Sequence, residues 1–127
     1  MNSKQTIKNT AFFLTKNVFS LTLRCGIKRE DFLKLKGSAR PSDNFDILKA
    51  LKAIKYTCDK LPTPWNKILL ERYLLGIRVK DLRVKYGISK AKFTKENKNN
   101  LILFAKEWEN TQDKLKLTGD NRIKLIA

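Results

Sequence analysis

Apolar residues in this 127-residue chain recur at spacings of three and four, and no convincing alternation of apolar and polar residues is flanked by turn residues. Spacings of three and four place side chains on one face of an α-helix, whereas a half-buried strand requires a period of two. The sequence therefore predicts an all-α protein built as a small helical bundle. A chain of this length fills one hydrophobic core but not two.

The first predicted helix runs from Thr6 to about Arg24 and ends near Gly26. Phenylalanines widen its apolar stripe, so this helix is either well covered or available to a partner. The stripe comprises Ile7, Ala11, Leu14, Val18 and Leu21, with Phe12, Phe13 and Phe19 beside it.

A second helix is predicted to start at a cap provided by Ser42 or Asp43. Its regular seam indicates either the core face of a bundle or a short dimerising coiled coil, and the bundle is favoured at this length. The seam of this second helix comprises Ile47, Leu51, Ile54, Cys58 and Leu61.

A third helix is predicted from Trp65 to Gly76, after the Thr63-Pro64 break.

Charge is unevenly distributed along the chain. There are 28 Lys and Arg residues against 12 Asp and Glu residues, a formal net charge of +16. Met1 to Arg40 holds nine basic and two acidic residues, and Gly76 to Asn100 holds eight basic and two acidic residues, so these two blocks carry +7 and +6. Such an excess indicates a polyanionic partner, with nucleic acid the first candidate and an anionic membrane surface the second. A lysine-rich surface that only confers solubility is the alternative.

Composition argues against an enzyme and against a metal or cofactor site. The chain has no histidine, and its two cysteines, Cys25 and Cys58, lie too far apart in the sequence for the close pairings typical of metal sites. The carboxylates, including Glu71, are expected on solvated helix faces. Apolar runs are too short to span a bilayer, and Lys16 and Asn17 interrupt the apolar stretch that a secretory signal would need, so a cytoplasmic location is expected.

The segment after Gly76 has the layout of a helix-turn-helix. A helix of about eight residues ends at Gly87, with Leu82, Val84 and Val79 expected on or near its inner side, and Ser89 caps a second helix two residues later. Phe93, Asn97, Leu101, Phe104 and Trp108 form the inward stripe of that second helix, weak at Asn97 and strong after it. Its N-terminal half is therefore predicted to stand outward, where it can enter the major groove of double-stranded DNA.

The candidate DNA-binding residues lie on both helices. The first helix contributes basic side chains on its outer face, and the second contributes its cap and short or basic side chains that reach bases and phosphates. They are Arg78, Lys80, Arg83, Lys85, Ser89, Lys90, Ala91, Lys92, Thr94, Lys95, Lys98 and Asn99.

Residues Leu61 to Glu109 resemble the helix-turn-helix of bacterial sigma-factor region four, and more closely the ArpU-type phage transcriptional regulators. The likeness rests on Leu61-Pro62, on Arg72-Tyr73-Leu74-Leu75-Gly76, on Tyr86-Gly87-Ile88-Ser89 and on Phe104-Ala105. The resemblance implies a phage or prophage regulator of late genes, with Lys90 to Lys98 as its recognition residues. Asp81-Leu82 followed by Arg83-Val84 is more basic than the usual pattern of such modules.

Three functions remain as alternatives. The leading hypothesis is a sequence-specific transcriptional activator in a bacterial host cell that also contacts host RNA polymerase, with residues 6–24 or 43–61 as candidate homodimer contacts. A DNA-recognition subunit of a phage packaging terminase and a protein-interaction adaptor are the others. The expected organisation is a basic helical arm (1–40), a DNA-binding domain (41–110) and a tail (111–127) that is either frayed or packed on a neighbour.

Overall fold

The computed structural model describes residues 1–127 and is all-helical, which confirms the predicted fold class. Two helices are interrupted or extended by π-helical turns, labelled η1 and η2, and a short 3₁₀ turn, η3, follows the last helix. None of the helices combines the length and the apolar character that a membrane crossing requires. The elements are α1 (Ser3–Phe12), η1 (Phe13–Asn17), α2 (Val18–Cys25), α3 (Arg29–Phe32), α4 (Ile47–Cys58), α5 (Trp65–Leu69), η2 (Leu70–Leu74), α6 (Val79–Tyr86), α7 (Lys90–Lys114) and η3 (Gly119–Asn121).

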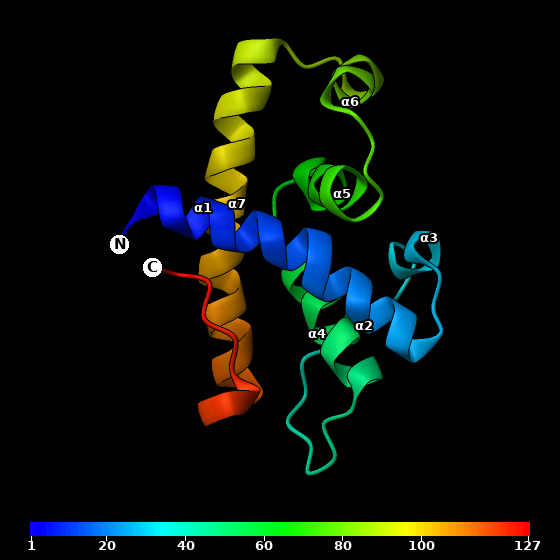
Figure 1. The fold of residues 1–127 in the computed structure, drawn as a ribbon, viewed down its shortest axis with the longest axis vertical. Helices are drawn as coiled ribbons and strands as arrows, with labels where there is room; N and C mark the ends of the chain where they lie inside the picture. The colour runs from blue at the N-terminus through cyan, green and yellow to red at the C-terminus, as the bar shows by residue number, and fades with distance from the viewer.

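The 25-residue helix α7 is the axis of the molecule (Figure 1). The continuous helix α1–η1–α2 crosses it near its middle, α4 lies beside its C-terminal half, and α5 and α6 lie beside its N-terminal half. The last residues return along α7 toward the start of the chain, where the Asn2 amide donates to the Ala127 carbonyl at 2.7 Å. Because only α5 and α6 lie beside the N-terminal half of α7, that half has protein on one side only (Figure 1).

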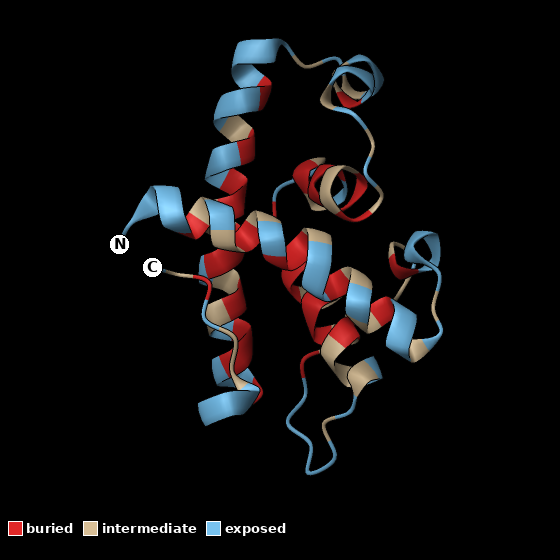
Figure 2. Ribbon diagram, in the orientation of Figure 1, coloured by how far each residue is buried: buried red, intermediate tan, exposed pale blue.

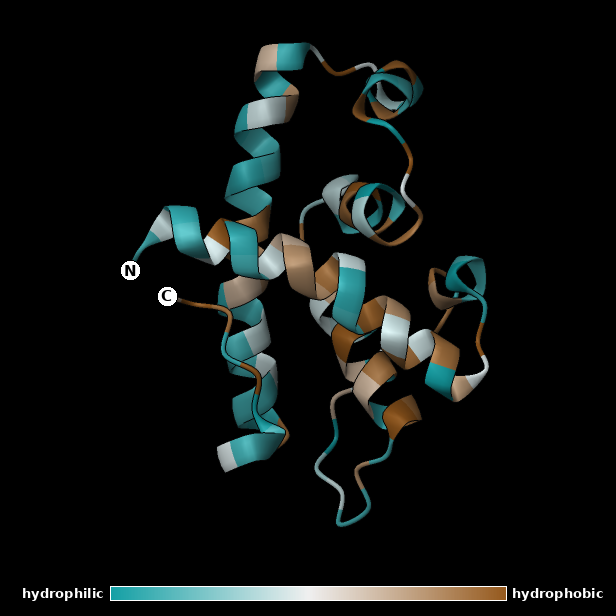
Figure 3. Ribbon diagram, viewed as in Figure 1, coloured by the Kyte–Doolittle hydropathy of each residue, from teal (hydrophilic) through white to brown (hydrophobic).

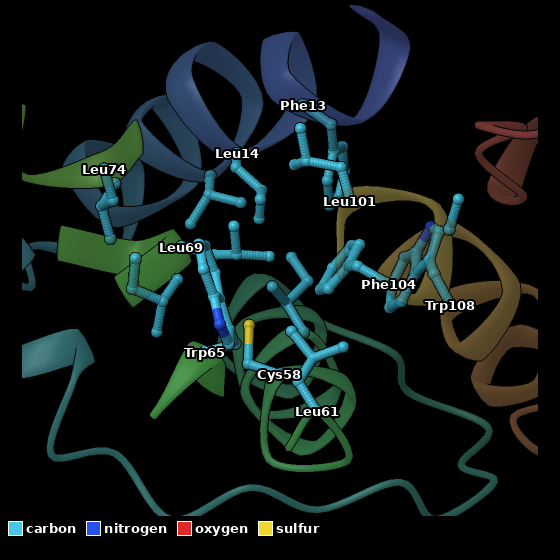
Figure 4. Close-up of a cluster of buried hydrophobic side chains, with 14 of the residues drawn as sticks. Phe13, Leu14, Cys58, Leu61, Trp65, Leu69, Leu74, Leu101, Phe104 and Trp108 are labelled. Carbon is cyan, nitrogen blue, oxygen red and sulfur yellow. The ribbon is translucent and has the colours of Figure 1, made fainter. Parts of the chain in front are cut away.

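One hydrophobic core of 23 buried residues joins all parts of the chain. Phe13 lies against Phe104 and Trp108, with ring centroids 6.1 and 5.6 Å apart, so the first helix packs directly on α7 (Figure 4). Leu125, near the end of the chain, belongs to the same core. Residues from the segments 1–40, 41–110 and 111–127 are thus packed together.

The buried face of the first helix differs from the predicted stripe. Thr6, Thr10 and Thr22 are fully buried, whereas Ile7, Ala11 and Leu21 are only partly buried. Each buried threonine donates its hydroxyl to a backbone carbonyl one turn earlier, so it enters the core without an unpaired polar group. The π-helical turn at Phe13–Asn17 also inserts an extra residue per turn and rotates the faces relative to one another. Phe12 and Leu23 remain exposed.

Helix α4 begins later than predicted. Its cap is Asp46, whose carboxylate accepts the Lys49 amide at 2.9 Å, and not Ser42 or Asp43. The seam from Leu51 to Leu61 is buried in the chain's own core, while Ile47 is only partly buried. Residues 43–61 therefore use this face for folding, as expected of a bundle helix.

Two further expectations are corrected at α6 and at the end of the chain. Leu82 is fully buried in α6, but Val84, two positions on and so on the opposite side of the helix, is 79% exposed. The tail packs on its own chain: Gln112 on α7 exchanges two hydrogen bonds with the Ile123 backbone, and the Asn9 amide donates to the Leu125 carbonyl.

Candidate functional site

A three-residue turn sets the geometry between α6 and α7. Gly87 ends α6 with a φ of +64°, in the left-handed region that favours glycine, and the Ser89 hydroxyl caps α7 by accepting the Lys92 amide at 3.3 Å. Two hydrogen bonds fix the turn: the Ile88 amide donates to the Arg83 carbonyl, and the Arg83 guanidinium Nε–H donates to the Ile88 carbonyl. The predicted boundaries of both helices are confirmed here.

The inner face of α7 is anchored along its whole length. At its N-terminal end Phe93 packs on Trp65 of α5, with ring centroids 5.1 Å apart, and the Trp65 indole donates to the Glu96 carboxylate at 2.9 Å. Asn97 is buried and donates to the Tyr73 hydroxyl at 2.8 Å. At this expected weak point of the stripe the Asn97 side chain thus makes one hydrogen bond through its amide N–H, while its Oδ1 is buried without a partner.

A buried carboxylate holds α6 in place. Glu71 in η2 is 4% exposed and accepts hydrogen bonds from the Lys85 ammonium, at 2.6 Å, and from the Tyr86 hydroxyl. The hydrogen bond to Glu71 raises the pKa of Lys85, and burial together with the same carboxylate raises the pKa of Tyr86. Glu71 was expected on a solvated face; the only sequence signal of its burial is the apolar run Ile68 to Leu70 directly before it.

The outer face of the N-terminal half of α7 is open to solvent. All seven candidate residues on it are exposed, in keeping with the largely exposed colouring of this half of α7 in Figure 2. Six of them line one shallow groove along the helix. The ammonium groups of its four lysines form no ion pair or hydrogen bond with the protein, and the upper part of the helix is strongly hydrophilic (Figure 3). The groove is lined by Lys90, Ala91, Thr94, Lys95, Lys98 and Asn99.

Lys92 lies on the edge of a second hollow beside that face. This hollow is formed by the loop before α5, the turn after α6 and α7 itself, with Trp65, Glu96 and Asn100 among its lining residues. The Glu96 carboxylate is occupied by the Trp65 indole. Lys92 and Asn99 therefore border both the open face of α7 and the hollow where three elements meet.

The four candidates on α6 have different surroundings. Lys80 is exposed without a partner, while Arg78 forms an exposed ion pair with Asp81 at 3.2 Å. Arg83 is half-buried and bound to the Ile88 carbonyl, and Lys85 is bound to Glu71. Arg83 and Lys85 therefore have structural roles, and Arg78 is already paired with a carboxylate. The free positive charge of this region is concentrated on α7 and at Lys80.

No group of three or more His, Cys, Asp or Glu side chains lies close enough together to hold a metal ion. Cys58 is fully buried, which raises the pKa of its thiol to about 12 and keeps it protonated and unreactive at neutral pH.

Comparison of the chain with models of known protein families, with curated proteins and with solved structures finds no match.

Proposed function

We propose that this protein binds double-stranded DNA, with α6, the turn and α7 acting as a helix-turn-helix and the N-terminal half of α7 as the recognition helix. The observation that carries the proposal is the row of unpaired lysines on the free side of a helix whose other side is firmly anchored. Packing this face of the helix against a neutral partner would bury several lysine charges without a counter-charge, whereas a polyanion neutralises them.

The dimensions of the open face suit a major groove. An α-helix with its side chains is about 10–12 Å across, which fits a major groove about 12 Å wide, and the ten residues from Lys90 to Asn99 give about 15 Å of helix to lie in it. Ala91 and Thr94 are short, so the helix backbone can approach the bases closely. Lysines can donate to phosphates or to guanine O6 and N7, and Asn99 has the donor and acceptor pair that suits adenine.

Within this proposal the anchoring contacts have a clear role. Phe93, Trp65 and the pair formed by Glu71 and Lys85 fix the angle between α6 and α7. A fixed angle allows α6 to rest on the DNA backbone through Lys80 while α7 enters the groove. Together with the resemblance to ArpU-type phage regulators, this arrangement favours a transcriptional regulator as the biological role.

Selection of bound duplexes from a random pool tests sequence recognition. An enriched motif supports a sequence-specific regulator, and its symmetry gives the number of protomers bound. Binding without enrichment at any salt concentration would contradict sequence recognition and leave only contacts to phosphates.

Charge reversal tests which surface is used. The triple variant Lys92→Glu, Lys95→Glu and Lys98→Glu is expected to weaken duplex binding by about a hundredfold or more, because three attractive contacts become repulsive. The matched control reverses three exposed, unpaired lysines elsewhere: Lys8, Lys16 and Lys106. Equal losses in both variants would show that only net charge matters.

A further inference from the structure

A second basic groove lies near the C-terminal end of α7, away from the proposed recognition face. It is formed by the loop before α4, the outer face of α4 and Lys114 at the end of α7. Lys114 lies sixteen residues beyond Lys98, which is about 24 Å along a helix. The second groove therefore lies outside the part of α7 that is proposed to enter the major groove. Its lining includes Lys36, Arg40, Lys52, Tyr56 and Lys114.

Tyr56 is the centre of this groove. The Lys114 ammonium donates to its hydroxyl at 3.0 Å and lies 4.9 Å from the ring centroid, and the Lys60 ammonium lies 4.8 Å from the same centroid. Lys52 lies on α4 four residues before Tyr56, and Lys60 lies four residues after Tyr56, two residues beyond the end of α4. Lys114, chiefly through its hydrogen bond, and Lys60 lower the pKa of Tyr56. The surroundings of the phenol are therefore strongly positive.

No carboxylate compensates this charge. The lining of the groove contains four basic residues and no Asp or Glu, and the neighbouring hollow, which shares Arg40 and Lys52, contains none either. Lys36, Arg40 and Lys52 form no side-chain hydrogen bond or ion pair. Like charges that line one groove repel each other, so an anion that binds among them is stabilised.

The shape of the groove is fixed by close backbone packing. Gly37 lies so near α4 that a Cβ atom there would meet the Tyr56 backbone nitrogen at 2.6 Å, and the Ser38 amide donates to the Lys52 carbonyl at 3.0 Å. The loop is thus held on α4, with Arg40 on the same side as Lys52. The backbone positions of Lys36, Arg40 and Lys52 are therefore set by the fold.

We propose that the groove around Tyr56 is a phosphate-binding site. A phosphate group carries up to two charges and several acceptor oxygens, so it can contact two lysines and the fork of Arg40 at once, which a single carboxylate matches less well. The Tyr56 hydroxyl accepts from Lys114 and keeps its own proton to donate to the anion. These contacts use none of the residues from Lys90 to Asn99 that are proposed to bind DNA.

Calorimetric titration with inorganic triphosphate at low ionic strength tests the site. The groove variant Arg40→Gln, Lys52→Gln and Lys114→Gln is expected to weaken triphosphate binding about tenfold or more, because charge-assisted hydrogen bonds are lost. The control variant Lys92→Gln, Lys95→Gln and Lys98→Gln removes the same charge from α7 and is expected to leave triphosphate binding unchanged. Triphosphate is also expected to raise the pKa of Tyr56 in the wild-type protein, because the anion neutralises the lysines beside it.

A short duplex added to the α7 control variant distinguishes the two sources of phosphate. Residual duplex binding that disappears when the groove changes are added assigns the site to a nucleic-acid backbone. If the groove changes leave duplex binding unchanged but abolish triphosphate binding, the site is assigned to a free phosphate compound.

The proposal is overturned if neither probe binds at the groove, or if the groove and α7 variants weaken triphosphate binding equally. Because loss of duplex binding in the α7 variant is read separately, failure of the groove is not confused with failure of the proposed DNA-binding surface.

Discussion

Replacing Glu71 with glutamine is expected to destabilise the protein by about 2–3 kcal/mol. The buried carboxylate binds the Tyr86 hydroxyl and the Lys85 ammonium, and a hydrogen bond to a charged group contributes about 1.5–3 kcal/mol. The amide of glutamine has one acceptor oxygen where the carboxylate has two, so one partner loses its bond. Because the Lys85 side chain is 58% exposed, its ammonium returns to water, and the loss stays below the 3–5 kcal/mol typical of breaking a fully buried pair.

Urea and thermal unfolding followed by circular dichroism measure this effect. For a chain of this length a loss of that size lowers Tm by about 6–12 °C. Glu107→Gln is the matched control, because the Glu107 side chain forms no ion pair, and it is expected to change stability by less than about 0.5 kcal/mol. A Glu71→Gln protein as stable as the wild type would refute the view that this carboxylate holds α6.

Three further results are expected. Ser89→Ala removes the cap of α7 and costs about 1 kcal/mol in urea unfolding, and an unchanged midpoint would show that the cap is dispensable. Gly37→Ala forces the loop away from the Tyr56 backbone and costs about 1–3 kcal/mol, measured in the same way; the reasoning fails if alanine is tolerated without loss. The pKa values of Lys85 and Tyr86 are raised, so the stabilisation by their bonds to Glu71 is complete below about pH 10 and is lost as the pH rises through the folded-state pKa values. Unfolding midpoints measured from pH 8 to 11 should therefore fall more steeply for the wild type than for the Glu71→Gln protein. Parallel curves would contradict this.

The region from Gly76 to Trp108 could be predicted from the sequence because its boundaries have strong local signals. Gly87 supplies a left-handed residue, Ser89 supplies a cap, and the stripe from Phe93 to Trp108 keeps helical spacing. These signals depend on backbone conformation and on period, which are local properties. The exposure of the lysines between them followed directly from that stripe.

Other features depended on information that a hydropathy pattern does not carry. A pattern of apolar residues places the first helix and the buried Leu14 and Val18 correctly, but it misses the buried threonines, because these satisfy their hydroxyls within the helix. Ser42, Asp43 and Asp46 are all good caps, so only packing decides where α4 begins. The burial of Glu71 requires two partners that lie 14 and 15 residues away in the sequence.

The same limit applies to the groove around Tyr56 and to the tail. The groove joins a loop, the face of α4 and the end of α7, so its residues are distant in the sequence. The tail packs in an extended conformation, which gives no helical period to detect, yet Leu125 reaches the core. The groove and the position of the tail thus depend on contacts between residues distant in the sequence, which local sequence patterns do not reveal.

The salt dependence of duplex affinity tests the central claim most directly. Each lysine that contacts a phosphate contributes a slope of about −0.9 to the plot of log K against log salt concentration. The Lys92→Gln, Lys95→Gln and Lys98→Gln variant is expected to lose up to about 2.7 of the wild-type slope, whereas the glutamine variant of Lys8, Lys16 and Lys106 keeps it. A wild-type protein whose duplex affinity does not change with salt, or an α7 variant with the full wild-type slope, would contradict the assignment of α7 as the DNA-binding surface.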